Sequence, residues 1–215
     1  MNIRDIIQLF NSKKKPLKRV LIDNNTEFNF SGKICSFTGH RPQKLPFDNE
    51  NNDECRKIKS LISESIITAI NYYECTNFIT GMALGTDIWA AEEVLSLQEK
   101  YDINLYAALP CETQNEKWMD YQKDRYDDIL LQCEQVYLIS REYSINCMQK
   151  RNQFLVNCAD LMIAVYDGKK GGTEQTINMA KRKNIDIITI NPNTKKVEIV
   201  EKVMKTDKSD SFKEE

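Results

Sequence analysis

Six of the chain's seven glycines stand where a hydrophobic run ends and helix-like sequence begins. A glycine in that place lets the backbone approach a ligand closely and leaves the N-terminus of the next helix open. Three such turns at the carboxyl ends of parallel strands would form one crevice, the usual ligand site of an open α/β sheet. Phosphate or another anionic group is the expected occupant. The turns are Gly39 after residues 34–38, Gly81 and Gly85 after residues 78–80, and Gly168, Gly171 and Gly172 after residues 161–167.

Strand-like and helix-like segments alternate through most of the chain. Their short links predict an α/β fold with a mostly parallel sheet covered by helices on both faces. We expect an N-terminal extension (1–33), one domain (34–195) and a charged C-terminal tail (196–215). In the extension, residues 3–10 could form a short amphipathic helix, and residues 19–22 either add a strand or pack on the domain edge. The expected strands are 34–38, 77–80, 103–109, 135–139, 161–165 and 185–190, and the expected helices are 52–73, 86–99, 115–132, 146–158 and 173–183.

The composition of the 215-residue chain is that of an ordinary soluble globular protein, with 41% hydrophobic and 29% charged residues. Its formal charge of −2 gives no general attraction to nucleic acid or anionic membranes. No apolar stretch reaches the ~18 residues of a membrane span, and the N-terminus does not read as a secretory signal. The seven cysteines are scattered without a CxxC pair, and there is one histidine. A metal site is therefore not expected, and buried reduced thiols in a cytoplasmic protein are.

The first turn reads Thr38-Gly39-His40-Arg41-Pro42. It offers backbone amides, an imidazole and a guanidinium to one spot, and Arg41 can hold a phosphate or carboxylate through two parallel hydrogen bonds. The alternative is a surface loop with an incidental basic pair. Because two more glycine turns follow other strands, we favour ligand binding as the role of this first turn. We expect His40 to form hydrogen bonds rather than to bind a metal.

The second turn, residues 81–87, has the spacing GxxxGxD, which matches neither a Walker loop nor a dinucleotide fingerprint. Thr86 or Asp87 could cap the following helix, or Asp87 could accept hydrogen bonds from ribose hydroxyls. The third turn, residues 171–173, makes a backbone nest with a hydroxyl beside it, suited to phosphate.

Trp118, on a polar stretch, could stack on a base or cover the crevice, or equally pack at a helix–sheet or subunit contact.

Together these turns resemble the SLOG superfamily and, within it, the YpsA-like branch, over residues 34–192 and in the right order. The resemblance implies a Rossmann-like three-layer α/β/α domain that binds nucleotide-type ligands and requires no cofactor. Because such sites often lie near a dimer seam in relatives, we also expect a homo-oligomer. The residues expected to bind the ligand are Thr38, Gly39, His40, Arg41, Gly81, Met82, Ala83, Gly85, Asp87, Pro110, Gln114, Trp118, Arg151, Asn152, Gly168, Gly171, Gly172, Thr173, Glu174 and Thr176.

One departure from related enzymes bears on mechanism. The "lonely guy" phosphoribohydrolases carry an arginine upstream of an aspartate and then a PGGxGTxxE loop, and the alignment puts Arg151 on their catalytic arginine. Thr176, however, stands where those enzymes place the glutamate. Glu174 lies about 200° around the helix from Thr176, so it would point elsewhere. The missing carboxylate favours binding over cleavage of an N-glycosidic bond.

The resemblance thus implies a protein that senses or sequesters a nucleotide-derived small molecule of the ADP-ribose or cyclic ADP-ribose type, in bacterial or phage immunity. The first alternative is a nucleotide hydrolase or phosphoribohydrolase that uses Arg151 with Asp87 or Glu174. The second alternative is a DNA-binding relative of the DNA processing protein DprA. The net negative charge and the lack of a basic stripe count against nucleic acid as a partner.

Overall fold

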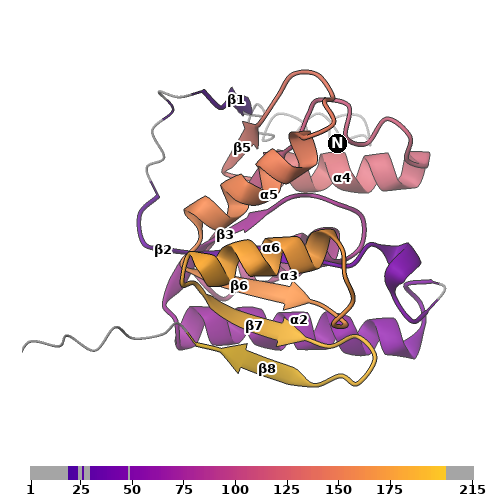
Figure 1. Cartoon of the computed structure of the whole chain (residues 1–215), viewed down its shortest axis with the longest axis vertical. Coiled ribbons are helices and arrows are strands. Elements are labelled where there is room, and N and C mark those ends of the chain that lie inside the picture. The colour runs from indigo at the N-terminus through magenta and orange to yellow at the C-terminus, as the bar shows by residue number, and fades with distance from the viewer. Residues whose placement is uncertain (1–18, 24–25, 27–29, 48, 202–215) are drawn as a thin grey trace, which may run out of the picture.

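The computed structural model describes residues 19–23, 26, 30–47 and 49–201. Within them one eight-stranded sheet has the order β1-β5-β4-β3-β2-β6-β7-β8 and is parallel except for the β7–β8 pair. Helices α5 and α6 cover one face of the sheet, and α2, α3 and α4 lie behind it (Figure 1). The predicted three-layer, Rossmann-like α/β fold is therefore confirmed. The strands are β1 (Arg19–Leu21), β2 (Lys33–Gly39), β3 (Cys75–Thr80), β4 (Asn104–Leu109), β5 (Gln135–Leu138), β6 (Leu161–Val165), β7 (Asp186–Ile190) and β8 (Val197–Val200), and the helices are α2 (Asp53–Asn71), α3 (Thr86–Leu97), α4 (Asp120–Gln132), α5 (Cys147–Cys158) and α6 (Gly172–Arg182), with a 3-10 turn η1 (Pro42–Lys44).

Two hydrophobic layers hold the helices to the sheet. Ile58, Ile62 and Ile66 recur at helical spacing along α2 and are fully buried in the larger layer, which α2, α3 and α4 share with the sheet. On the other face, α5 and α6 bury a smaller set that includes Val156 and Ile177. Every residue of β6 is buried, because helices cover both sides of this central strand.

The strand order creates a switch point between β2 and β6. From β2 the chain builds outward through β3, β4 and β5, and it then returns to place β6 on the other side of β2. The connections that leave β2 and β6 therefore diverge to opposite sides of the sheet. The carboxyl ends of these two strands leave a crevice between them, where open α/β sheets bind ligands.

Three segments differ from the sequence-based expectation or complete it. Residues 19–21 do add a strand, since β1 pairs in parallel with β5, whereas the helix suggested at residues 3–10 lies outside the described residues. Residues 197–200, assigned to the tail, form β8 antiparallel to β7 after a turn in which the Asn191 side chain accepts two backbone N–H groups. Helix α4 begins at Asp120 rather than at residue 115, because residues 112–117 form turns.

Among the described residues, no helix is both long and apolar enough to cross a membrane.

Candidate functional site

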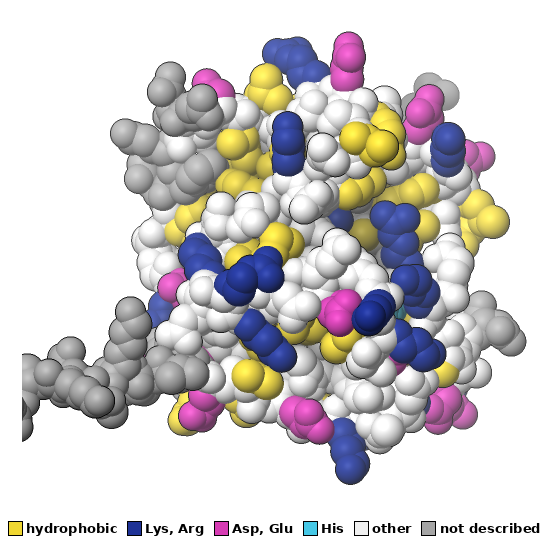
Figure 2. Space-filling model, in the orientation of Figure 1, with side chains coloured by type: hydrophobic (Ala, Val, Ile, Leu, Met, Phe, Trp, Pro, Cys, Tyr) yellow, Lys and Arg dark blue, Asp and Glu magenta, His cyan; other side chains and the backbone are white. Residues whose placement is uncertain are grey.

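A cavity of about 390 Å³ opens at the switch point; we call it the main cavity. Its walls come from the end of β2, the η1 turn, the turn after β3, and helices α3, α5 and α6. It therefore brings parts of all three predicted glycine turns to one place. On the face of the molecule drawn in Figure 2, lysine and arginine side chains gather at the right-hand side. The strands β6 and β7 point toward this side in Figure 1. The lining residues are Thr38, Gly39, His40, Arg41, Gln43, Lys44, Ala83, Asp87, Met148, Arg151, Asn152, Gly172 and Thr173.

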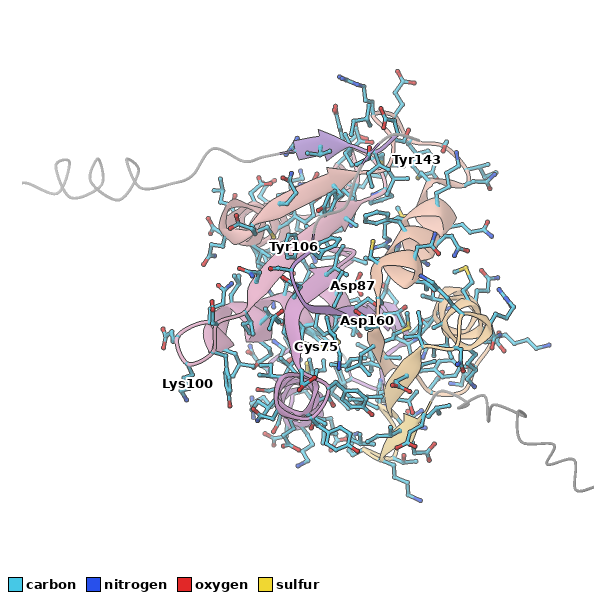
Figure 3. All side chains as sticks on the ribbon, turned by 90° about the vertical axis from the view of Figure 1, so that its left-hand side faces the viewer. Cys75, Asp87, Lys100, Tyr106, Tyr143 and Asp160 are labelled. Atoms are coloured by element: carbon cyan, nitrogen blue, oxygen red, sulfur yellow. The ribbon has the colours of Figure 1, made fainter. Side chains whose placement is uncertain are left out.

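A buried ion pair crosses the floor of the main cavity. Arg151 reaches from α5 to Asp87 on α3, so it links the two helix layers, and Nη1 donates to Oδ2 at 3.3 Å. The two side chains are 6% and 8% exposed, and Asp87 lies near the middle of the view in Figure 3. This is the only hydrogen bond or ion pair that Arg151 makes within the described residues, and its buried Nε has no partner there. Most of the donors of this guanidinium are therefore free for another acceptor.

Burial sets the protonation tendencies of this pair. It raises the pKa of Asp87 above the usual value, although Arg151, the Ala83 amide and Arg41 all favour the ionised carboxylate. It lowers the pKa of Arg151, against the attraction of Asp87. Both shifts have the same cause, because each charged group has lost water without gaining a full set of partners.

The second turn is shaped to make room for Arg151. A Cβ added to Gly81 would lie 1.4 Å from Nη1 of Arg151, so any larger residue would displace the guanidinium. Gly85 has φ +89° and would press a Cβ against the His40 carbonyl oxygen. Met82 also has a positive φ of 56°, uncommon for a side chain of its size. Gln114 holds this turn by donating from Nε2 to the Met82 carbonyl at 2.6 Å.

The N-terminus of α6 forms the opposite wall. Gly171 is its cap residue and provides no side-chain hydrogen bond, and the first helical bond runs from the Gln175 N–H to the Gly171 carbonyl. The amides of Gly172 and Thr173, which line the cavity, therefore precede the first bonded turn. A Cβ on Gly172 would meet nothing within 4 Å, which leaves open space above these amides. Free amides and the helix dipole make this a place for an anion.

A buried imidazole–carboxylate pair closes the cavity beside β2. His40 Nε2 lies 2.8 Å from Asp167 Oδ1, and both side chains are almost fully buried. Burial would raise the pKa of Asp167, but hydrogen bonds from the Lys169 amide, the Lys169 ammonium and His40 outweigh it and lower the pKa to about 2. The backbone amide of Asp167 also lies 3.2 Å from the same Nε2, so this ring nitrogen faces both the carboxylate and the amide of Asp167. The pair fixes the orientation of the imidazole in the cavity wall.

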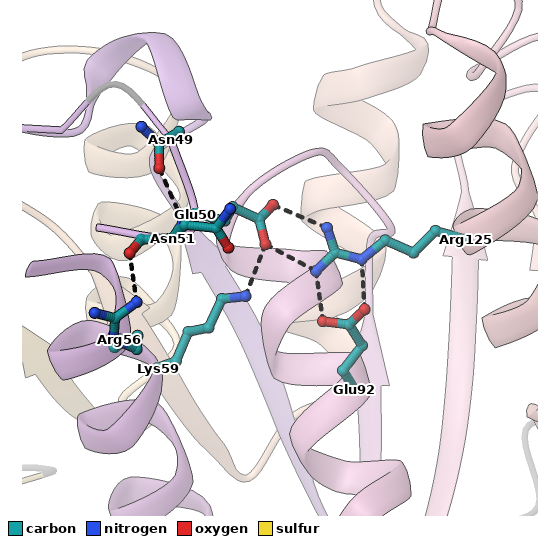
Figure 4. Close-up of polar contacts among 7 residues, drawn as sticks. All are labelled: Asn49, Glu50, Asn51, Arg56, Lys59, Glu92 and Arg125. Carbon is teal, nitrogen blue, oxygen red and sulfur yellow. Dashed lines mark hydrogen bonds and ion pairs between the residues drawn. The ribbon is translucent and has the colours of Figure 1, made fainter. Parts of the chain in front are cut away.

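The loop that carries η1 is tied to the helices behind it (Figure 4). Glu50 in this loop accepts hydrogen bonds from Lys59 of α2 and from Arg125 of α4, at 2.7 and 2.8 Å. The remaining donors of Arg125 bind Glu92 of α3. This network, which we call the Arg125 network, anchors the loop so that Arg41 and Lys44 are held over the main cavity.

Comparison with known proteins identifies the family. The family model described as the YspA SLOG family, YpsA, matches residues 35–207. The chain belongs to this family. A UPF0398 protein of Bacillus cereus strain ATCC 14579 is 30% identical over 158 residues, which cover 72% of this chain and 85% of that protein. A UPF0398 protein of Bacillus thuringiensis strain Al Hakam has the same identity and coverage.

Two solved structures share the fold of this YpsA-family chain. DNA processing protein A (DprA) from Streptococcus pneumoniae superposes with a TM-score of 0.52 at 14% identity, over 74% of this chain and 50% of that protein. The chain thus spans half the length of the pneumococcal protein. Helicobacter pylori DNA processing protein A, whose structure is described by its single-stranded DNA binding mode, gives a TM-score of 0.50 at 16% identity, over 77% and 68%. At these identities the likeness shows the fold alone.

Many of the predicted site residues line the main cavity, and the others do not. Gly81, Met82, Gly85 and Gln114 shape the turn beneath Arg151, as described above. Trp118 packs edge-on against Tyr126, with ring centroids 5.3 Å apart, beside the larger hydrophobic layer. The predicted residues that line the cavity are Thr38, Gly39, His40, Arg41, Ala83, Asp87, Arg151, Asn152, Gly172 and Thr173; those that do not are Gly81, Met82, Gly85, Pro110, Gln114, Trp118, Gly168, Gly171, Glu174 and Thr176.

Four residues of the site were not predicted. Gln43 and Lys44 enter through the η1 turn, and Met148 lies one helical turn before Arg151 and Asn152 on α5. Nothing in the pattern of residues around these three distinguishes them from surface positions. Asp167, the partner of His40, directly follows the apolar run of β6. A carboxylate at the end of a strand beside a glycine turn was a usable signal for Asp167.

Proposed function

We propose that the main cavity binds an anionic, nucleotide-derived small molecule of the ADP-ribose or cyclic ADP-ribose type. The observation that carries this proposal is Arg151, a buried guanidinium with one long hydrogen bond, placed at the topological switch point. A buried cation with unused donors is unfavourable by itself, and an anionic ligand would supply the missing acceptors. The volume of the cavity is in the range of small-molecule sites.

A phosphate fits the cavity chemically from two sides. Arg151 and the exposed Arg41 would supply charge, and the free amides of Gly172 and Thr173 would supply neutral donors and the helix dipole. Asp87 is the carboxylate of the cavity and is occupied by Arg151 and by the Ala83 amide, so its repulsion of an anion is reduced. Sensing or sequestration of the ligand, in bacterial or phage immunity, is the role we propose for this binding.

The surroundings of Thr176 favour binding over turnover. Its Oγ donates to the Gly172 carbonyl at 2.9 Å and accepts from Asn152 at 3.0 Å, so this buried position is filled by a hydroxyl network and not by a carboxylate. Glu174 does not line the main cavity. It also does not line a second cavity that adjoins the main one at His40, Gln43 and Lys44. An enzyme would have to rely on Arg151 and Asp87, and those two already form an ion pair with each other.

The test combines affinity and turnover on the full chain. Calorimetry should detect binding of ADP-ribose or a cyclic ADP-ribose isomer, and chromatography after long incubation should recover the nucleotide intact. Conversion of a molar excess to free base and ribose phosphate would instead promote the enzyme alternative. Asp87→Asn and Glu174→Gln would then show which carboxylate serves in proton transfer. Mass spectrometry of any small molecule that co-purifies with the protein would identify the natural ligand class.

Single-stranded DNA is the second candidate, favoured by the fold shared with Helicobacter pylori DNA processing protein A. A DNA site would show an affinity that falls steeply with salt, because several phosphates release counterions together. Anisotropy measurements with a fluorescent oligo-dT at two salt concentrations would test this. Tight binding that ADP-ribose does not compete away would overturn the small-molecule proposal.

A further inference from the structure

A second cavity of about 440 Å³ adjoins the main one. The two share three lining residues, His40, Gln43 and Lys44, so residues of the η1 turn and the imidazole form a wall common to both. The other walls of the second cavity come from the turn after β6 and from Asn193 in the β7–β8 connection. Of the residues in the three glycine turns that line the main cavity, only His40 also lines the second cavity.

The second cavity carries an excess of positive charge. Lys44, Lys169 and Lys170 line it, and Asp167 is the one acid among its lining residues. The Lys169 ammonium, 3.1 Å from Oδ2, balances the charge of Asp167, whose Oδ1 also accepts from the Lys169 amide and lies beside His40. Within the described residues Lys44 and Lys170 form no side-chain hydrogen bond or ion pair, so their two ammonium groups have no counter-charge there.

Lys44 connects the two cavities. Its Nζ would lie 3.1 Å from a Cβ added to Gly171, so the ammonium sits against the first turn of α6, where the free amides of the main cavity begin. A ligand anchored at those amides would therefore pass beside Lys44 as it entered the second cavity. The imidazole of His40, held by Asp167, lines the same passage.

We propose that the second cavity holds a second anionic group of the same ligand, which is then an ADP-ribose-type nucleotide that carries a further phosphate at a position separate from its diphosphate. The inference rests on the proposed function of the main cavity. The lining favours a small molecule over a single nucleic-acid strand, because neither cavity is lined by Phe, Tyr or Trp side chains on which successive bases could stack.

The test compares AMP, with one phosphate, and adenosine 3′,5′-bisphosphate, with two, by calorimetry on the full chain. The informative variant is Lys170→Glu, because Lys170 is exposed, lines the second cavity and not the main one, and has no side-chain partner among the residues that the structure describes. The matched control is Lys100→Glu, the same charge reversal on an exposed lysine at a remote loop (Figure 3). At about 0.15 M salt the Debye length is about 8 Å, so the control measures the residual long-range effect.

Wild type should bind the bisphosphate about tenfold more tightly than AMP, as expected for one added charge-assisted contact. Lys170→Glu should remove that advantage and leave the affinity for AMP at the level of the Lys100→Glu control. Equal affinity of wild type for both probes, or equal losses for both probes in Lys170→Glu, would overturn the second anionic subsite and leave the main site standing. Absence of binding of either probe to wild type would overturn the second anionic subsite, and together with tight oligo-dT binding it would overturn the proposed function itself.

Discussion

Arg125 and Arg151 are both partly or fully withdrawn from water, and both pair with carboxylates, yet their surroundings differ. Arg125 binds Glu50 through Nη1 and Nη2 and Glu92 through Nε and Nη2, so every nitrogen of its guanidinium is used. Arg151 is more deeply buried and makes one 3.3 Å contact, with Nε unpaired among the described residues. The first arginine is satisfied by the protein, and the second is left with spare donors.

The difference separates a structural site from a candidate binding site. In the Arg125 network the hydrogen bonds raise the pKa of Arg125 against the effect of burial. At Arg151 the effect of burial prevails and the pKa is lowered. Natural proteins rarely bury a charge with unused donors, and buried ionisable groups with perturbed pKa values cluster at functional sites. The contrast predicts that Arg125 contributes to stability and Arg151 to ligand affinity.

The largest expected effect is on binding. Arg151→Ala should weaken binding of ADP-ribose by about 10- to 100-fold, since a charge-assisted hydrogen bond in a partly desolvated site contributes about 1.5–3 kcal/mol. Arg125→Ala should change the affinity less than twofold. Calorimetry on both purified variants measures the contrast directly.

Two further variants make that result interpretable. Arg182→Ala removes an exposed arginine that has no side-chain partner in the described structure, and it serves as the surface control. Arg151→Lys keeps the charge but loses the planar fork, and should give an intermediate affinity. Unchanged affinity of a folded Arg151→Ala protein would move Arg151 to a structural role and remove the basis of the comparison.

Gly81→Ala sharpens the comparison without touching either arginine. The new methyl group would lie 1.4 Å from Nη1 of Arg151, so the guanidinium must leave its place. We expect ADP-ribose affinity to fall about tenfold, a loss of about 1.4 kcal/mol, while the Arg125 network stays intact. Arg182→Ala, the surface variant above, is the control, because it lies outside the lining of the main cavity. Equal affinities of the two variants would show that the observed position of Arg151 is not needed for binding.

The fold was largely predictable from the sequence, and the site only in part. Buried strands, helical periodicity and glycine turns are local signals, and they predicted every strand from β2 to β7 and each described helix. The short strand β8 was missed because its four residues, interrupted by Glu198, are too few to stand out from the charged sequence around them. The reason for Gly81 was also missed: its space is filled by Arg151, which is 70 positions later in the chain. Contacts between distant segments leave no periodic trace in sequence.

A stability measurement tests the other half of the comparison. Arg125→Ala should lower the free energy of unfolding by about 2 kcal/mol, between the values typical of exposed and buried ion pairs, because it leaves Glu50 and Glu92 facing each other without their shared cation. Urea denaturation of this variant and of Arg182→Ala would measure it. A loss no larger than that of the control would mean that the network is replaceable by water.

The smallest expected effect is the pH dependence of the Arg125 network. Burial alone would raise the pKa of Glu50, but hydrogen bonds from Arg125 and Lys59 outweigh it and lower the pKa from 4.5 to about 2. A carboxylate with a depressed pKa stabilises the fold above its unfolded pKa, and that stabilisation is lost as the pH falls from 4.5 toward 2. Because Glu50 is about one-third exposed, solvent screening reduces the contribution to about 1 kcal/mol. Urea denaturation at several pH values should show wild type more stable than Glu50→Gln at pH 7, with the difference shrinking toward pH 3.

Glu99→Gln, at an exposed position whose side chain binds no other described residue, should differ little from wild type throughout. A difference between wild type and Glu50→Gln that does not change with pH would show that packing, and not the charge of Glu50, holds the loop beside the main cavity.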